Sequence, residues 1–199
     1  MSLSSVQKAM SEITQHIEMY SKKLDQKKVQ LILKTLQTQN NVFVYGAGRS
    51  GLVGKAFAMR LMHLSINVFV IGETVYPAIK ENDVLFVISG SGETSAIVNA
   101  CKSAKEKKAK IIALTSNLNS TIGKLADLVL EVQGRTKLAV GTGKDYEQKQ
   151  IIGFHQPLSP LGTLFEDTCQ VLLDGIIVGL MQEMGKSEKE LKERHANIE

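Results

Sequence analysis

The sequence predicts an α/β protein with three layers, in which a doubly wound, five-stranded parallel sheet lies between two layers of helices. From residue 41 onward, short apolar segments alternate with longer segments whose apolar residues recur at helical spacing. One of the short segments, DVLFVIS (83–89), is apolar almost throughout, as is typical of a strand buried on both faces of a parallel sheet. Strands that alternate with helices form parallel sheets, and ligands bind at the carboxyl ends of their strands.

Two amphipathic helices precede the sheet, at 3–21 and 25–39, because apolar residues recur there every three or four positions. The five predicted strands are 41–45, 67–71, 83–89, 110–116 and 125–132. The helices between them are expected at 51–64, 94–108 and 119–125.

The C-terminal part is predicted to be helical. Ser159 and Pro160 suit the N-cap and first position of a long helix, 160–184, and Gly185 suits its end. A short polar helix at 187–194 follows, and the chain ends in RHANIE. The segment 133–159 shows little periodicity, and because a loop of this length is usually functional, His155 within it is a candidate for lining a site.

The length and composition fit one domain. A chain of 199 residues, 43% hydrophobic, can bury a sizeable core, so we expect a single domain over 1–199 with its core at about 25–185. The net charge of +4 is mildly basic, and its densest lysine cluster, KSAKEKKAK (102–110), contains no aromatic residue. This pattern favours a solvated helix face over a nucleic-acid site, while a mild positive charge suits a small anionic ligand.

The sequence does not indicate a membrane or secreted protein. The longest apolar stretch, VLLDGIIVGLM (171–181), is interrupted by Asp174, and the N-terminus has no basic region followed by an apolar segment. Cys101 and Cys169 lack C-x-x-C spacing, so two buried thiols in a reducing compartment fit better than a disulfide. We therefore expect a cytoplasmic protein with no membrane partner.

A glycine turn, GAGRSG (46–51), follows the first strand. Gly46, Gly48 and Gly51 have the G-x-G-x-x-G spacing of a dinucleotide-binding turn, and Glu73 lies at the distance expected of a ribose ligand. A nicotinamide-dependent dehydrogenase is therefore one hypothesis. Against it, two helices precede the first strand, and Arg49 with its neighbouring serine supplies a cation and a hydroxyl that suit an anionic polyol.

A second glycine turn, SGSGET (89–94), follows the third strand and is the more specific signal. Ser89, Ser91 and Thr94 supply hydroxyls, Gly90 and Gly92 allow backbone N–H groups to turn toward an anion, and a helix N-terminus follows. Such a turn can hold a phosphate monoester without a metal. The plainer alternative is that these hydroxyls only cap the helix, with the threonine as N-cap.

These motifs resemble those of a sugar isomerase (SIS) domain, a phosphosugar-binding family with a flavodoxin-like fold. The resemblance rests on GAGRSG, SGSGET and IIALTSNLNSTIGKLAD (111–127), and it covers almost the whole chain. Within that family, the arginine of GAGRSG, the stretch PLGTLFED (160–167) and RHANIE (194–199) are similar to the 6-phospho-3-hexuloisomerases in particular.

The resemblance implies interconversion of D-arabino-3-hexulose 6-phosphate and D-fructose 6-phosphate through a cis-enediol, without a cofactor. It also implies a role in the ribulose monophosphate pathway, either in formaldehyde assimilation or in the reverse supply of pentoses, and a functional pairing with a 3-hexulose-6-phosphate synthase. A homotetramer is expected as well, with the N-terminal helix and the C-terminal tail in subunit contacts.

The resemblance assigns catalysis to two residues. Glu166 is expected to be the base, in an otherwise apolar helix, although it could instead edge the polar stripe of Asp167, Gln170 and Asp174. His195 is expected to be an acid and base, in its own or a neighbouring subunit's site, although a histidine in a polar tail is ordinarily only exposed. The substrate-binding residues are expected to be Gly48, Arg49, Ser50, Gly51, Ser89, Gly90, Ser91, Gly92 and Thr94.

Other interpretations remain. Four histidines and two cysteines show no ligand spacing, so no metal is expected. Gly141–Lys144 is followed by Asp145 and lacks the spacing of a nucleotide-binding P-loop. An arabinose 5-phosphate isomerase would have the same fold, but that group usually has lysine where Arg49 stands and lacks RHANIE. A phosphosugar-sensing SIS module that has no catalytic activity is the alternative from a different class of protein.

Overall fold

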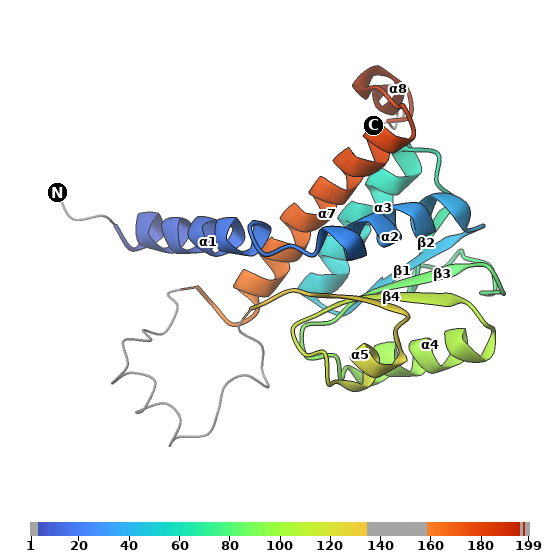
Figure 1. Ribbon diagram of the computed structural model, residues 1–199, viewed down its shortest axis with the longest axis horizontal. Helices are drawn as coiled ribbons and strands as arrows, with labels where there is room; N and C mark the ends of the chain where they lie inside the picture. Colours follow the sequence, from blue (N-terminus) through green and yellow to red (C-terminus); the bar gives the residue numbers. More distant parts are fainter. Residues whose placement is uncertain (1–3, 135–158, 196, 198–199) are drawn as a thin grey trace.

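A five-stranded, all-parallel sheet with the order β2-β1-β3-β4-β5 lies at the centre of the computed structural model, which describes residues 4–134, 159–195 and 197 (Figure 1). The strands are β1 (Val42–Gly46), β2 (Val68–Val70), β3 (Val84–Ile88), β4 (Lys110–Thr115) and β5 (Leu128–Glu131). The order 2-1-3-4-5 is that of a flavodoxin-like doubly wound sheet. The predicted fold class is confirmed.

Helices cover both faces of this sheet (Figure 1). One layer contains α2 (Gln26–Thr38), α3 (Arg49–His63) and α7 (Thr163–Glu183). The other contains α4 (Ser95–Glu106) and α5 (Thr121–Leu125). Two further described helices lie outside these layers, α1 (Ser5–Ser21) and α8 (Glu188–Lys192).

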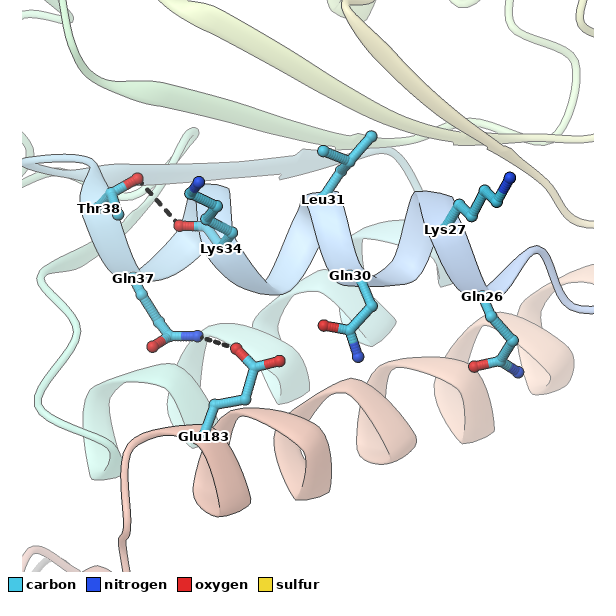
Figure 2. A pocket seen from close by; sticks show the side chains of 8 residues that line it. All are labelled: Gln26, Lys27, Gln30, Leu31, Lys34, Gln37, Thr38 and Glu183. Carbon is cyan, nitrogen blue, oxygen red and sulfur yellow. Dashed lines mark hydrogen bonds between the residues drawn. The ribbon is translucent and has the colours of Figure 1, made fainter.

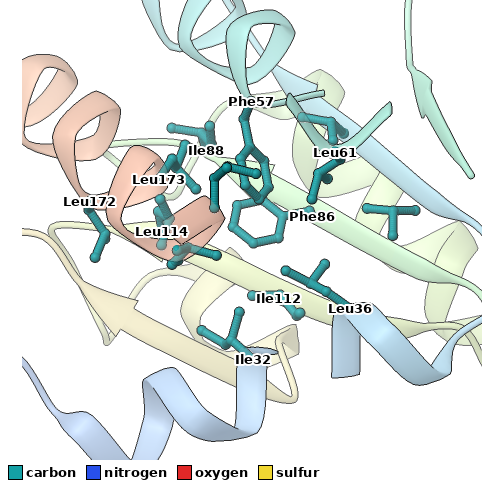
Figure 3. Close-up of a cluster of buried hydrophobic side chains, with 14 of the residues drawn as sticks. Ile32, Leu36, Phe57, Leu61, Phe86, Ile88, Ile112, Leu114, Leu172 and Leu173 are labelled. Carbon is teal, nitrogen blue, oxygen red and sulfur yellow. The ribbon is translucent and has the colours of Figure 1, made fainter. Parts of the chain in front are cut away.

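Side chains along β3 point alternately into the two cores, one on each face of the sheet. Phe86 and its neighbours at even positions belong to the core beneath α2, α3 and α7, whereas Leu85 and Val87 belong to the core beneath α4 and α5. Because both faces are covered, every residue of β3 is buried, which explains its continuous apolar sequence. Figure 3 shows the first core, where the Phe57 and Phe86 rings lie with centroids 5.0 Å apart.

Helix α1 projects from the body of the molecule and contacts it through α7 (Figure 1). It contains no buried residue, and the side chains of Val6 and Met10 are 65% and 62% exposed. On α7, Val171 and Val178 are also exposed apolar residues. The exposed face of α1 fits the expectation that the N-terminal helix makes subunit contacts, which stays a prediction.

The predicted start of α7 is wrong by three residues. Gly162 is the N-cap, in the left-handed conformation with φ +93°, and the helix begins at Thr163. The buried Ser159 instead contacts Glu12 of α1, with 3.4 Å between its Oγ and the Glu12 Oε1. The predicted end is confirmed, because Gly185 follows the helix with φ +63°. Glu166 therefore lies in the first turn of α7.

Both cysteines are free and buried, as expected. Cys101 belongs to the core on the α4 side of the sheet and Cys169 to the core on the α7 side, so the sheet separates the two thiols. Within the described residues, none of the helices has the length and apolar character that crossing a bilayer requires. Most of the predicted loop 133–159, including Gly141–Lys144 and His155, lies outside the described residues.

Candidate active site

The two glycine turns lie side by side at the carboxyl edge of the sheet. In the register of the parallel strands, Gly46 at the end of β1 pairs with Ile88 at the end of β3, so GAGRSG and SGSGET begin at neighbouring positions. The chain continues from β1 toward β2 and from β3 toward β4, which lie on opposite sides of this pair. This is the switch point of the sheet, where doubly wound proteins bind their ligands.

The first turn has the close backbone packing that its glycines predict. A Cβ on Gly46 would lie 2.7 Å from the Ser50 backbone, and one on Gly51 would lie 2.8 Å from the Gly46 carbonyl oxygen. Gly48, with φ +58°, is the N-cap of α3, and a Cβ there would meet nothing within 4 Å. Ser50 is buried, whereas Arg49 begins the helix with its side chain 59% exposed.

The hydroxyls of the second turn are not used to cap α4. Thr94 is the N-cap by position, but its side chain makes no capping hydrogen bond and lies 3.3 Å from the Oγ of the buried Ser89. Ser91 Oγ accepts a bond from the backbone N–H of Glu93. The plainer interpretation, in which the threonine hydroxyl caps the helix, is therefore wrong.

The loop after β4 braces the second turn, and sequence reasoning assigned no role to these contacts. Gly92, with φ +67°, lies so close to Ser120 that an added Cβ would be 2.0 Å from the Ser120 Oγ. The carbonyl of Gly90 accepts bonds from the backbone and hydroxyl of Ser116, at 3.1 and 2.6 Å. These contacts hold the second turn in place at the carboxyl edge of the sheet.

Glu93 ties the same turn to α5. Its carboxylate accepts bonds from the backbone N–H and the hydroxyl of Thr121, at 2.7 and 2.8 Å, and these bonds lower the pKa of Glu93. The loop after β4 and α5 both lie within the stretch 111–127, which resembles the SIS family. That resemblance was the only sequence signal that pointed to these contacts.

A carboxylate pair and a guanidinium meet beside the first turn. Arg49 Nε donates to Glu166 Oε2, and Arg49 Nη2 lies 3.3 Å from Asp167 Oδ1. The Glu166 side chain is only 13% exposed, so this carboxylate does not belong to a wet polar stripe. Gly162 leaves room for the Glu166 carboxylate, because a Cβ at position 162 would lie only 3.3 Å from it. The pairing of Asp167 with Arg49 was not predicted.

His195 does not join this group within one chain. Its ring stacks on that of His63, with centroids 4.2 Å apart, at the far end of α3 from Arg49. The 15 residues of α3 place about 20 Å between these two ends. His63 is buried and its Nδ1 has no hydrogen-bond partner in the described structure. Burial, followed by the charges of His195, Arg60 and Arg194, lowers the pKa of His63.

Two other features lie apart from this centre. Glu73, the candidate ribose ligand, forms an ion pair of 2.5 Å with Lys55. A groove of about 670 Å³ runs along α2. Figure 2 shows its lining side chains, among which Gln37 donates to Glu183 of α7. Its lining consists of glutamines, two lysines and a few other residues, and it contains none of the predicted site residues.

Comparison with known proteins shows which family the chain resembles. The model of the SIS domain family matches residues 35–143. A protein of Aeropyrum pernix is 46% identical over 96% of this chain and 92% of its own length. The 3-hexulose-6-phosphate isomerase of Bacillus subtilis is 37% identical over 81% of this chain and 82% of its own length. A Methanococcus jannaschii protein of known structure, inferred to be a 3-hexulose-6-phosphate isomerase, is 28% identical with a TM-score of 0.76, covering 99% of this chain and 100% of its own.

Proposed function

Because the chain belongs to the SIS domain family, we propose that it interconverts D-arabino-3-hexulose 6-phosphate and D-fructose 6-phosphate. The observation that carries the proposal is the contact between Glu166 and Arg49 at the sheet edge, beside a glycine turn lined with hydroxyls. A partly buried carboxylate, a guanidinium and an anion-binding turn are the groups that a sugar-phosphate isomerase needs.

The second turn is the proposed phosphate site. The hydroxyls of Ser89, Ser91 and Thr94, the backbone of Gly90 and Gly92, and the N-terminus of α4 supply donors and a favourable dipole for a phosphate monoester. The hydroxyl of Thr94 makes no capping hydrogen bond, so it remains available to a phosphate, which supports this assignment. The first turn, with Gly48, Gly51, Arg49 and Ser50, would then hold the carbon chain.

Glu166 is the proposed base. In the 3-keto sugar it takes the proton from C2, the C2–C3 bond becomes double, and the O3 oxygen accepts a proton to give the enediol. The same carboxyl group then returns a proton to C3 while O2 loses its proton and becomes the C2 carbonyl. The enediol is planar at C2 and C3, so a single carboxylate above one face of the proposed cis-enediol can serve both carbons.

The phosphate on O6 leaves the 3-keto sugar no hydroxyl that can close a five- or six-membered ring on C3. The substrate in this direction is therefore open-chain, and ring opening is required only in reverse. We expect Arg49 to stabilise the negative charge that develops on the sugar oxygens, because its guanidinium already lies against the base.

His195 is the proposed acid and base for the oxygen protons, acting at a neighbouring subunit's site. Its place at the opposite end of α3 from Arg49, the partner of Glu166, supports a neighbour's site over its own. Residues 192–195 are exposed, which supports contact of His195 with a second copy. A homotetramer and a functional pairing with a 3-hexulose-6-phosphate synthase complete the proposal.

The test is turnover of purified protein with D-arabino-3-hexulose 6-phosphate, with fructose 6-phosphate formation coupled to a reporter. We expect turnover, with solvent deuterium incorporated at C3 when the reaction runs in D₂O. Arabinose 5-phosphate serves as the second substrate, and its preference over the hexulose would favour the aldose–ketose isomerase. No turnover of either sugar, with tight binding of fructose 6-phosphate, would favour a sensing module.

A further inference from the structure

We propose that Asp167 is a positioning residue that fixes the guanidinium of Arg49 so that its Nε faces Glu166. The proposal rests on the proposed function, in which Glu166 is the base. The observation is that one edge of a single guanidinium is shared between the carboxylates of two consecutive residues of α7.

The geometry of the guanidinium gives this arrangement a consequence. Nε and Nη2 form its side-on edge, which commonly binds one carboxylate with two parallel bonds. Here Nε goes to Glu166 and Nη2 to Asp167, so neither carboxylate takes both donors. Nη1 makes no hydrogen bond to a described residue, which leaves a donor for a substrate oxygen, and one oxygen of Glu166 is not engaged by Nε.

A second anchor is needed because Arg49 is long and 59% exposed. A single contact from Nε would allow the guanidinium plane to swing about that contact and carry the Glu166 carboxylate with it. Consecutive residues on a helix project about 100° apart, so Asp167 holds the guanidinium from a different direction. Proton transfer to and from carbon depends on placement to within a fraction of an ångström, so the anchor is expected to affect rate more than binding.

The experiment compares Asp167→Ala and Asp167→Asn with Asp174→Ala. Asp174 lies on the same helix and is bonded to Gln170, so its variant is the matched control. We expect Asp167→Ala to lower kcat roughly tenfold, the scale of one hydrogen bond to a charged group, with little change in KM. Asp167→Asn keeps an acceptor of the same size and should restore part of the rate, and Asp174→Ala should match the wild type.

Two further readouts separate positioning from a merely structural effect. In an Arg49→Lys background, which has no side-on edge, Asp167→Ala should cause little additional loss of kcat. The rate at which phenylglyoxal modifies Arg49, followed by mass spectrometry, should rise in Asp167→Ala and stay unchanged in Asp174→Ala.

An unchanged kcat in Asp167→Ala, or the full tenfold loss in the Arg49→Lys background, would overturn the positioning role. The phenylglyoxal rate does not depend on turnover. If the wild type does not isomerise the sugar, the proposed function fails on that result, while an unchanged phenylglyoxal rate would separately show that Asp167 does not hold Arg49.

Discussion

Gly92 connects the fold to the proposed phosphate site, and its replacement by alanine gives a prediction with a magnitude. An alanine there would adopt φ +67°, which costs roughly 1–2 kcal/mol for an L-residue. Its Cβ would also lie 2.0 Å from Ser120 Oγ and 2.5 Å from Ser120 Cβ, and overpacking of this kind costs roughly 1–3 kcal/mol. We expect the free energy of unfolding to fall by roughly 2–5 kcal/mol, and Tm by roughly 4–20 °C.

The function should suffer in the same variant, because relief of the clash displaces the turn. Loss of one hydrogen bond to the phosphate raises KM for the sugar phosphate by about tenfold. Urea unfolding gives the first quantity and steady-state kinetics the second.

A second substitution tests the cause of this loss. Ser120→Gly removes both clashing atoms, and as an N-cap of α5 glycine costs only a few tenths of a kcal/mol relative to serine. In the Gly92→Ala background, Ser120→Gly should therefore restore the part of the stability lost to the clash, while the cost of the positive φ remains. Alone, Ser120→Gly should be slightly destabilising. A Gly92→Ala protein as stable as the wild type, or one that Ser120→Gly destabilises further, would refute the packing argument.

Two other predictions concern His63 and His195, whose rings stack on each other. The pKa of His63 is lowered in the folded protein, so folding favours the neutral ring. The stability that the neutral His63 ring contributes is therefore present above about pH 6.5 and is lost as the pH falls below that value. The urea midpoint should thus decrease from pH 7 to pH 5, and His63→Gln should flatten this dependence; an equally steep decrease in the variant would contradict the assignment. If His195 acts at a neighbour's site, mixing Glu166→Gln with His195→Ala subunits should restore part of the activity, and well-mixed hybrids that stay inactive would argue against a shared site.

The fold could be predicted because its cause is local. A strand buried on both faces must be apolar throughout, as in 83–89, and a helix that covers one face must be amphipathic, so the alternation of the two patterns specified the layers. The start of α7 was missed because Ser159 and Pro160 form a good local helix start. The tertiary contact of the serine with Glu12 and the left-handed glycine at 162 overrode that preference.

The candidate site was predictable only in part, for a similar reason. The glycine turns are short and continuous in sequence, so their spacing was visible, and the brace by Ser120 was visible only as family-like sequence. The contacts of Arg49 with Glu166 and Asp167 join residues more than 110 positions apart, which no periodicity encodes. The placement of His195 against His63 is equally non-local, and it shows that the two predicted catalytic residues do not meet within one described chain.

The role of Glu166 as the base is the central claim, and the kinetics of Glu166→Gln test it most directly. Glutamine keeps the shape of the side chain but cannot take a proton from C2. The variant should bind fructose 6-phosphate about as tightly as the wild type, while its kcat falls by at least 10²–10⁴-fold, the usual contribution of a general base. It should also lose exchange of solvent deuterium into the sugar. A Glu166→Gln protein with a near-normal kcat and normal deuterium exchange would contradict the account.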